Sequence, residues 1–185
     1  MDSLLLVSLL YEVVGKKEFQ EGLVDLVFKE AKNKENVGEN KYIQIPKSVK
    51  SIEHHAFENC KSLTSVTIPD SVTSIANYAF AYCNNLTSIT LPESVTSIKF
   101  GTFYKCNSLT SINIPDSVTT IEFDTCYKCS SLTSITIPYL VTSIGECAFS
   151  NCINLISITI PRFFEKRMKD IFTYVDLSSI KITYI

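Results

Sequence analysis

The sequence predicts a solenoid, in which short repeats stack on one another around one continuous core. A segment close to Leu-Thr-Ser-Ile-Thr-Ile-Pro occurs five times. Consecutive prolines stand 23 residues apart along the whole array, and five of the cysteines keep the same step; these residues are Pro46, Pro69, Pro92, Pro115, Pro138, Pro161, Cys60, Cys83, Cys106, Cys129 and Cys152. Self-similarity at a fixed period is the mark of repeat architectures, whose units bury their apolar faces against their neighbours.

Each repeat carries apolar residues at fixed distances from its proline. After Pro69, for example, come Val72, Ile75, Phe80 and Leu86, and one repeat has Cys126 in place of the phenylalanine. The alternation before each proline predicts a half-buried strand that the proline ends, because proline has no N–H for the ladder. We therefore expect parallel strands at 43–45, 63–68, 86–91, 109–114, 132–137, 155–160 and 177–182, with short second-side strands and 3₁₀ turns between them.

The two ends of the chain depart from the repeat. Residues 1–14 are an apolar run without the basic start or cleavage site of a signal peptide, and residues 17–32 have helical periodicity, so residues 1–40 predict a helical N-terminal cap. Residues 41–161 hold the 23-residue repeats. Residues 162–185 predict a C-terminal cap with a helix and a final strand, whose Leu177 stands 22 residues after Leu155. Caps cover the apolar ends of such arrays.

Composition narrows the possible functions. The chain has 17 basic and 19 acidic residues among 185, and this balance argues against nucleic-acid binding. The apolar N-terminal run is too short to span a bilayer, so we expect no membrane insertion. Seven cysteines are an odd number, and their side chains should project in parallel, so we expect free thiols and a reducing compartment. A cytoplasmic location follows, with the cell surface or secretion as the alternative.

The sequence offers no pattern typical of an enzyme. Cys126 and Cys129 form a C-x-x-C pair, but both fill core positions of the repeat and no second ligand pair accompanies them. His54 and His55, the two histidines, occupy a position that varies between repeats. No activating base is evident for any serine or threonine. We expect no catalytic residue, no metal and no cofactor.

The outward positions of the main strands form the candidate site. Ser88, Thr90, Ser111, Asn113, Ser134 and Thr136 should lie on three successive strands of one exposed face. The simplest interpretation is that threonine suits an exposed strand, and the functional one is a recognition surface for a protein. The acidic residues Asp70, Glu93 and Asp116 flank this face and favour a basic partner. A rarer alternative is an ice or crystal surface that the hydroxyl columns would match.

The repeat, written L-T-S-I-T-I-P-x-S-V-T-S-I-x-x-x-A-F-x-x-C-x-S, resembles the BspA-like class of leucine-rich repeats. The resemblance covers residues 43–161. It implies a right-handed, curved leucine-rich-repeat solenoid with a parallel sheet, and a role in binding proteins or surfaces. We therefore expect a monomeric, non-enzymatic protein–protein interaction module. An adhesin-like surface binder is the alternative.

Overall fold

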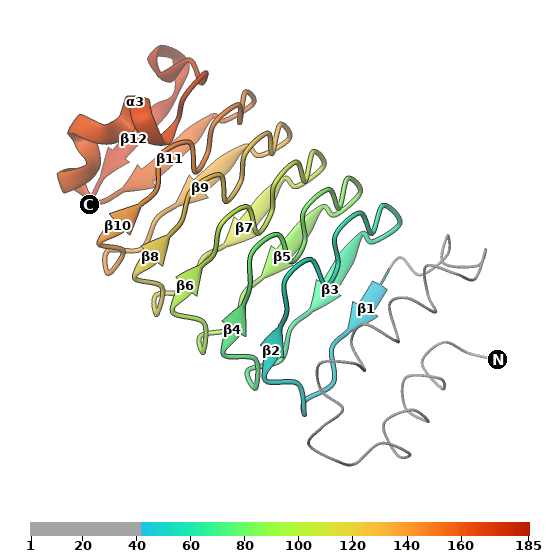
Figure 1. The fold of residues 1–185 in the computed structure, drawn as a ribbon. Helices are drawn as coiled ribbons and strands as arrows, with labels where there is room; N and C mark the ends of the chain where they lie inside the picture. The colour runs from blue at the N-terminus through green and yellow to red at the C-terminus, as the bar shows by residue number, and fades with distance from the viewer. Residues whose placement is uncertain (1–41) are drawn as a thin grey trace, which may run out of the picture. The chain divides into compact units, whose positions relative to one another are not determined.

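Parallel strands, one from each repeat, form the main side of the solenoid (Figure 1). The computed structural model describes residues 42–185, so the predicted N-terminal cap lies outside the described residues. The main strands are β1 (Tyr42–Gln44), β3 (Ser65–Thr67), β5 (Ser88–Thr90), β7 (Ser111–Asn113), β9 (Ser134–Thr136), β11 (Ser157–Ile160) and β12 (Lys181–Tyr184). Equivalent residues of neighbouring repeats lie opposite one another; for example, Ser88 lies opposite Ser111. The predicted solenoid of parallel strands is confirmed.

Two-residue strands line the second side of the array, also as predicted (Figure 1). They are β2 (Ser51–Ile52), β4 (Ser74–Ile75), β6 (Ser97–Ile98), β8 (Thr120–Ile121) and β10 (Ser143–Ile144). The isoleucine of each strand is buried, while the residue before it is exposed or half-buried. The two rows of strands therefore enclose one core between them.

The core consists of columns of identical side chains that touch from repeat to repeat. Phe57 and Phe80 stack with ring centroids 4.9 Å apart, and Phe80 and Phe103 with centroids 5.9 Å apart. Cys126 interrupts this column, and Phe149 resumes it against Phe172 at 5.4 Å. The predicted inward positions are thus correct, because Val, Ile, Phe, Cys and Leu of the central repeats are all buried.

The main strands are shorter than predicted. Leu63 and its equivalents precede the strand and belong to a turn, because the Leu63 N–H donates to the Cys60 carbonyl at 3.0 Å. Two further positions in each repeat adopt a left-handed backbone, as at Tyr78 (φ 56°) and Tyr82 (φ 59°). Left-handed residues interrupt helical hydrogen bonding, so the segment forms successive single turns instead of 3₁₀ helices. Gly101 occupies one such position, where a Cβ atom would lie 2.5 Å from the Tyr78 ring.

The cysteine column forms a ladder of thiol hydrogen bonds that the sequence did not suggest. The Cys106 thiol donates to the Phe80 carbonyl of the preceding repeat, with Sγ and O 3.1 Å apart. Cys83, Cys129 and Cys152 make the equivalent bond at 3.1–3.2 Å. Burial raises the pKa of these four thiols, because a thiolate would be poorly solvated there. The cysteines therefore join the repeats as neutral donors.

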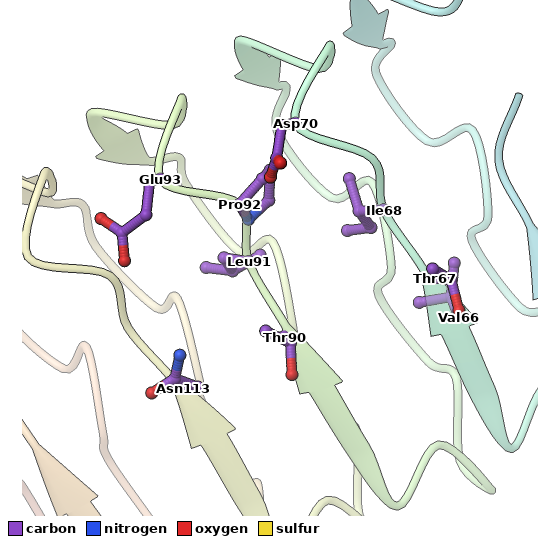
Figure 2. A pocket seen from close by; sticks show the side chains of 9 residues that line it. All are labelled: Val66, Thr67, Ile68, Asp70, Thr90, Leu91, Pro92, Glu93 and Asn113. Atoms are coloured by element: carbon purple, nitrogen blue, oxygen red, sulfur yellow. The ribbon is translucent and has the colours of Figure 1, made fainter. Parts of the chain in front are cut away.

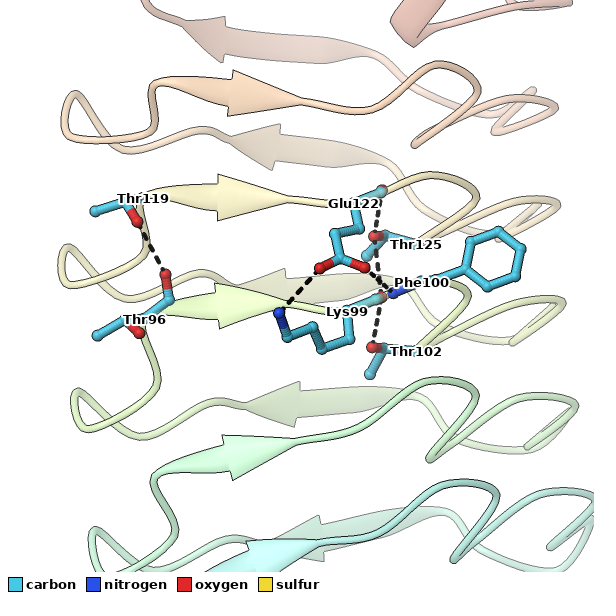
Figure 3. Close-up of polar contacts among 7 residues, drawn as sticks. All are labelled: Thr96, Lys99, Phe100, Thr102, Thr119, Glu122 and Thr125. Atoms are coloured by element: carbon cyan, nitrogen blue, oxygen red, sulfur yellow. Dashed lines mark hydrogen bonds and ion pairs between the residues drawn. The ribbon is translucent and has the colours of Figure 1, made fainter.

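Hydroxyl groups join neighbouring repeats in the same way. Thr110 Oγ1 donates to the Thr87 carbonyl at 3.0 Å. Figure 3 shows the equivalent bond on the second side, from Thr119 Oγ1 to the Thr96 carbonyl at 3.3 Å. Figure 3 also shows Glu122, which binds the Lys99 ammonium at 3.0 Å and the Phe100 N–H at 3.1 Å in the preceding repeat. Each of these bonds requires neighbouring repeats of equal length, since donor and acceptor are set by register.

The C-terminal segment is a modified repeat. It contains a 3₁₀ helix η3 (Arg162–Arg167), a single turn of helix α3 (Met168–Ile171) and a second 3₁₀ helix η4 (Leu177–Ser179) before β12. The predicted register of the final strand is wrong, because Lys181 pairs with Ser157, 24 residues before it. The Asp176 carboxylate accepts from the Ser178 N–H and caps η4, and this extra turn delays the strand.

Replacement of a buried aromatic ring should destabilise the array far more than replacement of an exposed one. Phe103 is fully buried and Phe123 is 54% exposed. We expect Phe103→Ala to lower the free energy of unfolding by about 3–5 kcal/mol, because neighbouring repeats cannot fill the cavity. Phe123→Ala serves as the matched control and should cost far less. Chemical denaturation measures both, and equal losses would contradict the assignment of the core column.

The ladder thiols should be reduced and slow to react in the folded protein. Cys83, Cys106, Cys129 and Cys152 are fully buried, whereas Cys147 and Cys60, the first cysteine of the 23-residue step, are half-buried. Because burial disfavours the reactive thiolate, we expect an alkylating reagent to modify Cys147 and Cys60 before the four buried thiols, which should react only after unfolding. Mass spectrometry of the peptides reads the order directly. Disulfide-linked ladder peptides, or equal rates at all positions, would contradict the prediction.

Candidate functional site

The six residues predicted to form the site lie on one exposed face of the main sheet. Ser88 and Thr90 belong to β5, and their counterparts in β7 and β9 follow in order. In each of these strands the outer two residues are exposed and the middle isoleucine is buried. The backbone connects β7 to β9 just before these strands, where the Thr133 N–H donates to the Thr110 carbonyl at 3.3 Å. The face is therefore continuous across three repeats.

The side chains of this face are not used to hold the described part of the solenoid together. The six side chains make no hydrogen bond to another residue in the 42–185 segment; they are Ser88, Thr90, Ser111, Asn113, Ser134 and Thr136. In contrast, Thr87, Thr110 and Thr133 beside them each donate to a carbonyl of the preceding repeat at 3.0–3.4 Å. The hydroxyl and amide groups of the face are thus available to a ligand.

A shallow, open depression of about 420 Å³ lies where β3, β5 and β7 end (Figure 2). Thr90 and Asn113 of the predicted site line it, together with Thr67, which occupies the equivalent position in β3. Asp70 and Glu93 stand at its border, in the turns that follow the strands (Figure 2). The depression therefore joins the polar face of the sheet to acidic side chains.

The acidic residues beside this face keep their charge exposed. Asp70, Glu93 and Asp116 form no ion pair with any other residue of the described segment. Glu122 on the second side differs, because Lys99 binds it at 3.0 Å. Three carboxylates on successive repeats, about 4.8 Å apart per step, create a negative row at one border of the sheet. This row favours a cationic ligand over an anionic one.

Aromatic rings gather on the turns between the second-side strands and the cysteines. Tyr104 stacks on Tyr127 with centroids 4.9 Å apart, and Tyr78 meets the edge of Phe100 at 4.9 Å. Desolvation raises the pKa of the nearby Asp124 carboxyl. Phe100 is half-buried under Tyr78, whereas Phe123 is exposed. These rings are largely engaged with one another, which supports a structural role.

The other residues considered from the sequence do not assemble into a chemical site. Cys126 and Cys129 are both fully buried, as their repeat positions predict. His55 contacts Glu58, with Nδ1 and Oε2 3.2 Å apart, and stacks on Tyr78. Within residues 42–185, no three histidine, cysteine or acidic side chains converge as metal ligands would. That segment also has no helix that is long and apolar enough to cross a membrane.

Sequence reasoning missed an apolar cluster near the C-terminal end of the array. Tyr139, Leu140 and Phe163 are 68%, 56% and 57% exposed. Tyr139 and Leu140 follow Pro138 directly, where the three preceding repeats have Asp-Ser, Glu-Ser and Asp-Ser. That change from polar to apolar at an outward position was a signal available in the sequence.

The comparisons with known proteins agree with the observed architecture. The family model of the BspA type leucine rich repeat region matches the chain in six copies, over residues 35–138 and 119–184. No curated protein matches the sequence.

Three bacterial structures are similar to this chain. The leucine-rich repeat protein TpLRR of T. pallidum is 33% identical, with a TM-score of 0.62 over 64% of this chain and 58% of that one. A leucine-rich repeat protein of Bacteroides ovatus is 30% identical, with a TM-score of 0.61 over 66% and 40%. A leucine rich cell surface protein of Faecalibacterium prausnitzii is 37% identical, with a TM-score of 0.52 over 64% and 38%. The match thus spans less than two thirds of each of these proteins.

The repeat, the two rows of strands and the family model all point to one assignment. Proteins of this type are generally binding modules or structural modules, as the exposed sheet would suit. The chain belongs to the family of BspA-type leucine-rich repeat proteins.

Proposed function

We propose that this chain is a non-enzymatic module that binds another protein through the exposed face of its main sheet. The observation that carries the proposal is the contrast between two sets of hydroxyl groups. Thr87, Thr110 and Thr133 donate to the backbone of the preceding repeat, whereas the neighbouring Ser111 and Thr136 make no such bond. A flat face whose polar groups are not needed by the fold suits recognition.

The groups on this face fit a polar partner. Serine and threonine hydroxyls both donate and accept hydrogen bonds, and Asn113 at the centre adds an amide that does the same. The negative row of Asp70, Glu93 and Asp116 favours lysine or arginine side chains at the border of the complex. We infer a partner that presents polar groups to the sheet and basic groups to this border.

Attachment to a surface is the second candidate. One of the similar structures is described as a leucine rich cell surface protein, and this chain shares 37% identity with it. The prediction of a cytoplasmic location rested on free cysteines. Those of the ladder are buried and hydrogen-bonded, so they would stay free in an oxidising compartment as well. We therefore favour secretion or the cell surface over the cytoplasm.

Recognition of ice or a crystal lattice receives less support. Such a surface requires an uninterrupted array of equal groups. Asn113 replaces threonine in the column that contains Thr90 and Thr136, at the centre of the face.

Two lysines on the sheet face should abolish binding without unfolding the protein. Ser111→Lys combined with Ser134→Lys places two long cations on neighbouring exposed positions. We expect the affinity for the native binding partner to fall by about tenfold or more through obstruction and through repulsion of basic groups. Titration calorimetry with that partner measures the loss.

The matched control adds the same charge elsewhere. Ser74→Lys with Ser143→Lys alters two exposed positions of the second-side strands β4 and β10. This pair should leave the affinity unchanged, and circular dichroism should show that both variants are folded. Equal affinity of the sheet-face variant and the wild type would place the binding site elsewhere.

A further inference from the structure

The residues that follow each proline form a row of identical turns at the carboxyl ends of the main strands, here called the turn row. In each turn an N–H donates to the proline carbonyl three residues earlier, from Val95, Val118 and Val141 at 3.0–3.1 Å. Phe164 makes the same bond to Pro161 at 3.0 Å. The two central residues of successive turns are therefore equivalent. They are Lys47-Ser48, Asp70-Ser71, Glu93-Ser94, Asp116-Ser117, Tyr139-Leu140 and Arg162-Phe163.

The last two turns of the row lack a bond that the three turns before them make. Ser71 and Ser117 donate from Oγ to the carbonyls of Val49 and Val95, at 2.9 and 2.8 Å. Leucine and phenylalanine have no such donor, so Leu140 and Phe163 give up this link to the preceding repeat. They expose more than half of their side chains instead.

Replacing the hydrogen-bonding serine of these turns by an exposed apolar residue does not evidently stabilise the folded chain. An exposed apolar side chain leaves unrealised the roughly 25 cal/mol per Å² that burial would provide. Clustered apolar side chains at outward positions mark interaction sites more often than single ones do. Tyr139, Leu140 and Phe163 lie on two adjacent turns, so one ligand could cover all three.

We propose that Tyr139, Leu140 and Phe163 form the anchor site for an apolar side chain of a protein segment whose flanking residues are basic. The charge requirement follows from the same row, because Asp70, Glu93 and Asp116 occupy the three turns that precede the anchor site and make no ion pair in the described segment. Each turn adds about 4.8 Å, so the step from Asp116 to Tyr139 matches one or two residues of an extended chain at ~3.3 Å each.

The C-terminal end of the turn row determines in which orientation the partner segment lies along it. Arg162 is exposed, pairs with Glu165 at 3.7 Å and lies over the Tyr184 ring at 5.2 Å. A cation beyond the anchor site would meet this guanidinium and be repelled. The basic residues of the partner therefore lie on the side of Asp116, Glu93 and Asp70.

This inference rests on the proposed binding through the main sheet and adds an anchor and a charge pattern to it. The test is selection of peptides from a displayed random library against the wild-type protein. We expect the selected peptides to combine an apolar or aromatic residue with lysine or arginine within about four residues, the reach of three turns at ~4.8 Å each.

The selected peptides are then titrated against variants. Tyr139→Ser with Leu140→Ser and Phe163→Ser removes the anchor site and restores, at the last two positions, the serine of the earlier turns. We expect the dissociation constant to rise about tenfold or more, as for the loss of one buried large apolar contact. Asp70→Asn with Asp116→Asn should weaken binding as well, and added salt should reduce that effect.

A control removes exposed apolar side chains elsewhere on the surface. Ile153 and Ile156 are 65% and 66% exposed, and equivalent positions of the earlier repeats hold Asn84 and Thr133. Ile153→Asn with Ile156→Thr should leave the dissociation constant unchanged. Thermal melts of all variants establish that they are folded.

Three results would overturn the inference. Selected peptides that bind the triple serine variant as tightly as the wild type would place the anchor elsewhere. Selected peptides without basic residues would contradict the charge pattern. A wild-type dimer in sedimentation that the triple serine variant abolishes would assign the anchor site to a second copy of the chain. If Ser111→Lys with Ser134→Lys abolishes binding while the triple serine variant does not, the sheet-face function stands and the anchor falls.

Discussion

Register between neighbouring repeats is the constraint on which this structure depends. Most strands pair with the equivalent strand of the next repeat, so Ile89 lies opposite Ile112 and Ile121 opposite Ile144, although pairing is interrupted between β7 and β9 and between β4 and β6. Side-chain donors also keep constant offsets: the Cys106 thiol donates to the Phe80 carbonyl 26 residues before it, and the Thr110 hydroxyl donates to the Thr87 carbonyl 23 residues before it. A single inserted residue would displace all these partners together. That is the physical reason for the constant 23-residue step between the prolines.

The same constraint explains why cysteine and the left-handed turn residues recur. The Phe80 carbonyl accepts from the Cys106 thiol, and also from the Cys83 N–H at 3.3 Å in its own repeat. Cysteine is small and apolar enough for the core, yet it supplies a donor that valine lacks. Left-handed residues reverse the chain between these bonds. Asn59, Asp124 and Asn151 suit that conformation, whereas Tyr78 and Lys128 adopt it at a conformational cost.

Because the stacking of the repeats fixes which residues face inward, recognition must come from the residues that face outward. The sheet face keeps hydroxyl groups. The turn row carries Lys47 in its first described turn and acidic residues in the next three, and its last two turns become apolar or basic. Each of these outward changes has little effect on the stability of the core, because the buried neighbours Val141 and Ile144 are unaltered. A solenoid can thus acquire a binding specificity along its surface while its register is retained.

The sequence by itself determined the repeat, the parallel strands, the buried columns and the exposed face of Ser88, Asn113 and Thr136. These follow from local periodicity, which directs side chains in or out whatever the neighbouring repeat does. Short strands, left-handed turns and the final register were decided by the tertiary structure.

The physical reason is that these features depend on hydrogen bonds between repeats or on turn geometry that composition does not encode. Leu177 resembles the start of a strand, but the capped turn at Asp176 delays pairing until Lys181 meets Ser157. The thiol ladder likewise requires that a carbonyl of one repeat face the cysteine of the next. The 23-residue step already makes Tyr139 and Arg162 equivalent in the sequence, but only the structure showed that both follow a proline whose carbonyl closes the same turn, from Val141 and from Phe164.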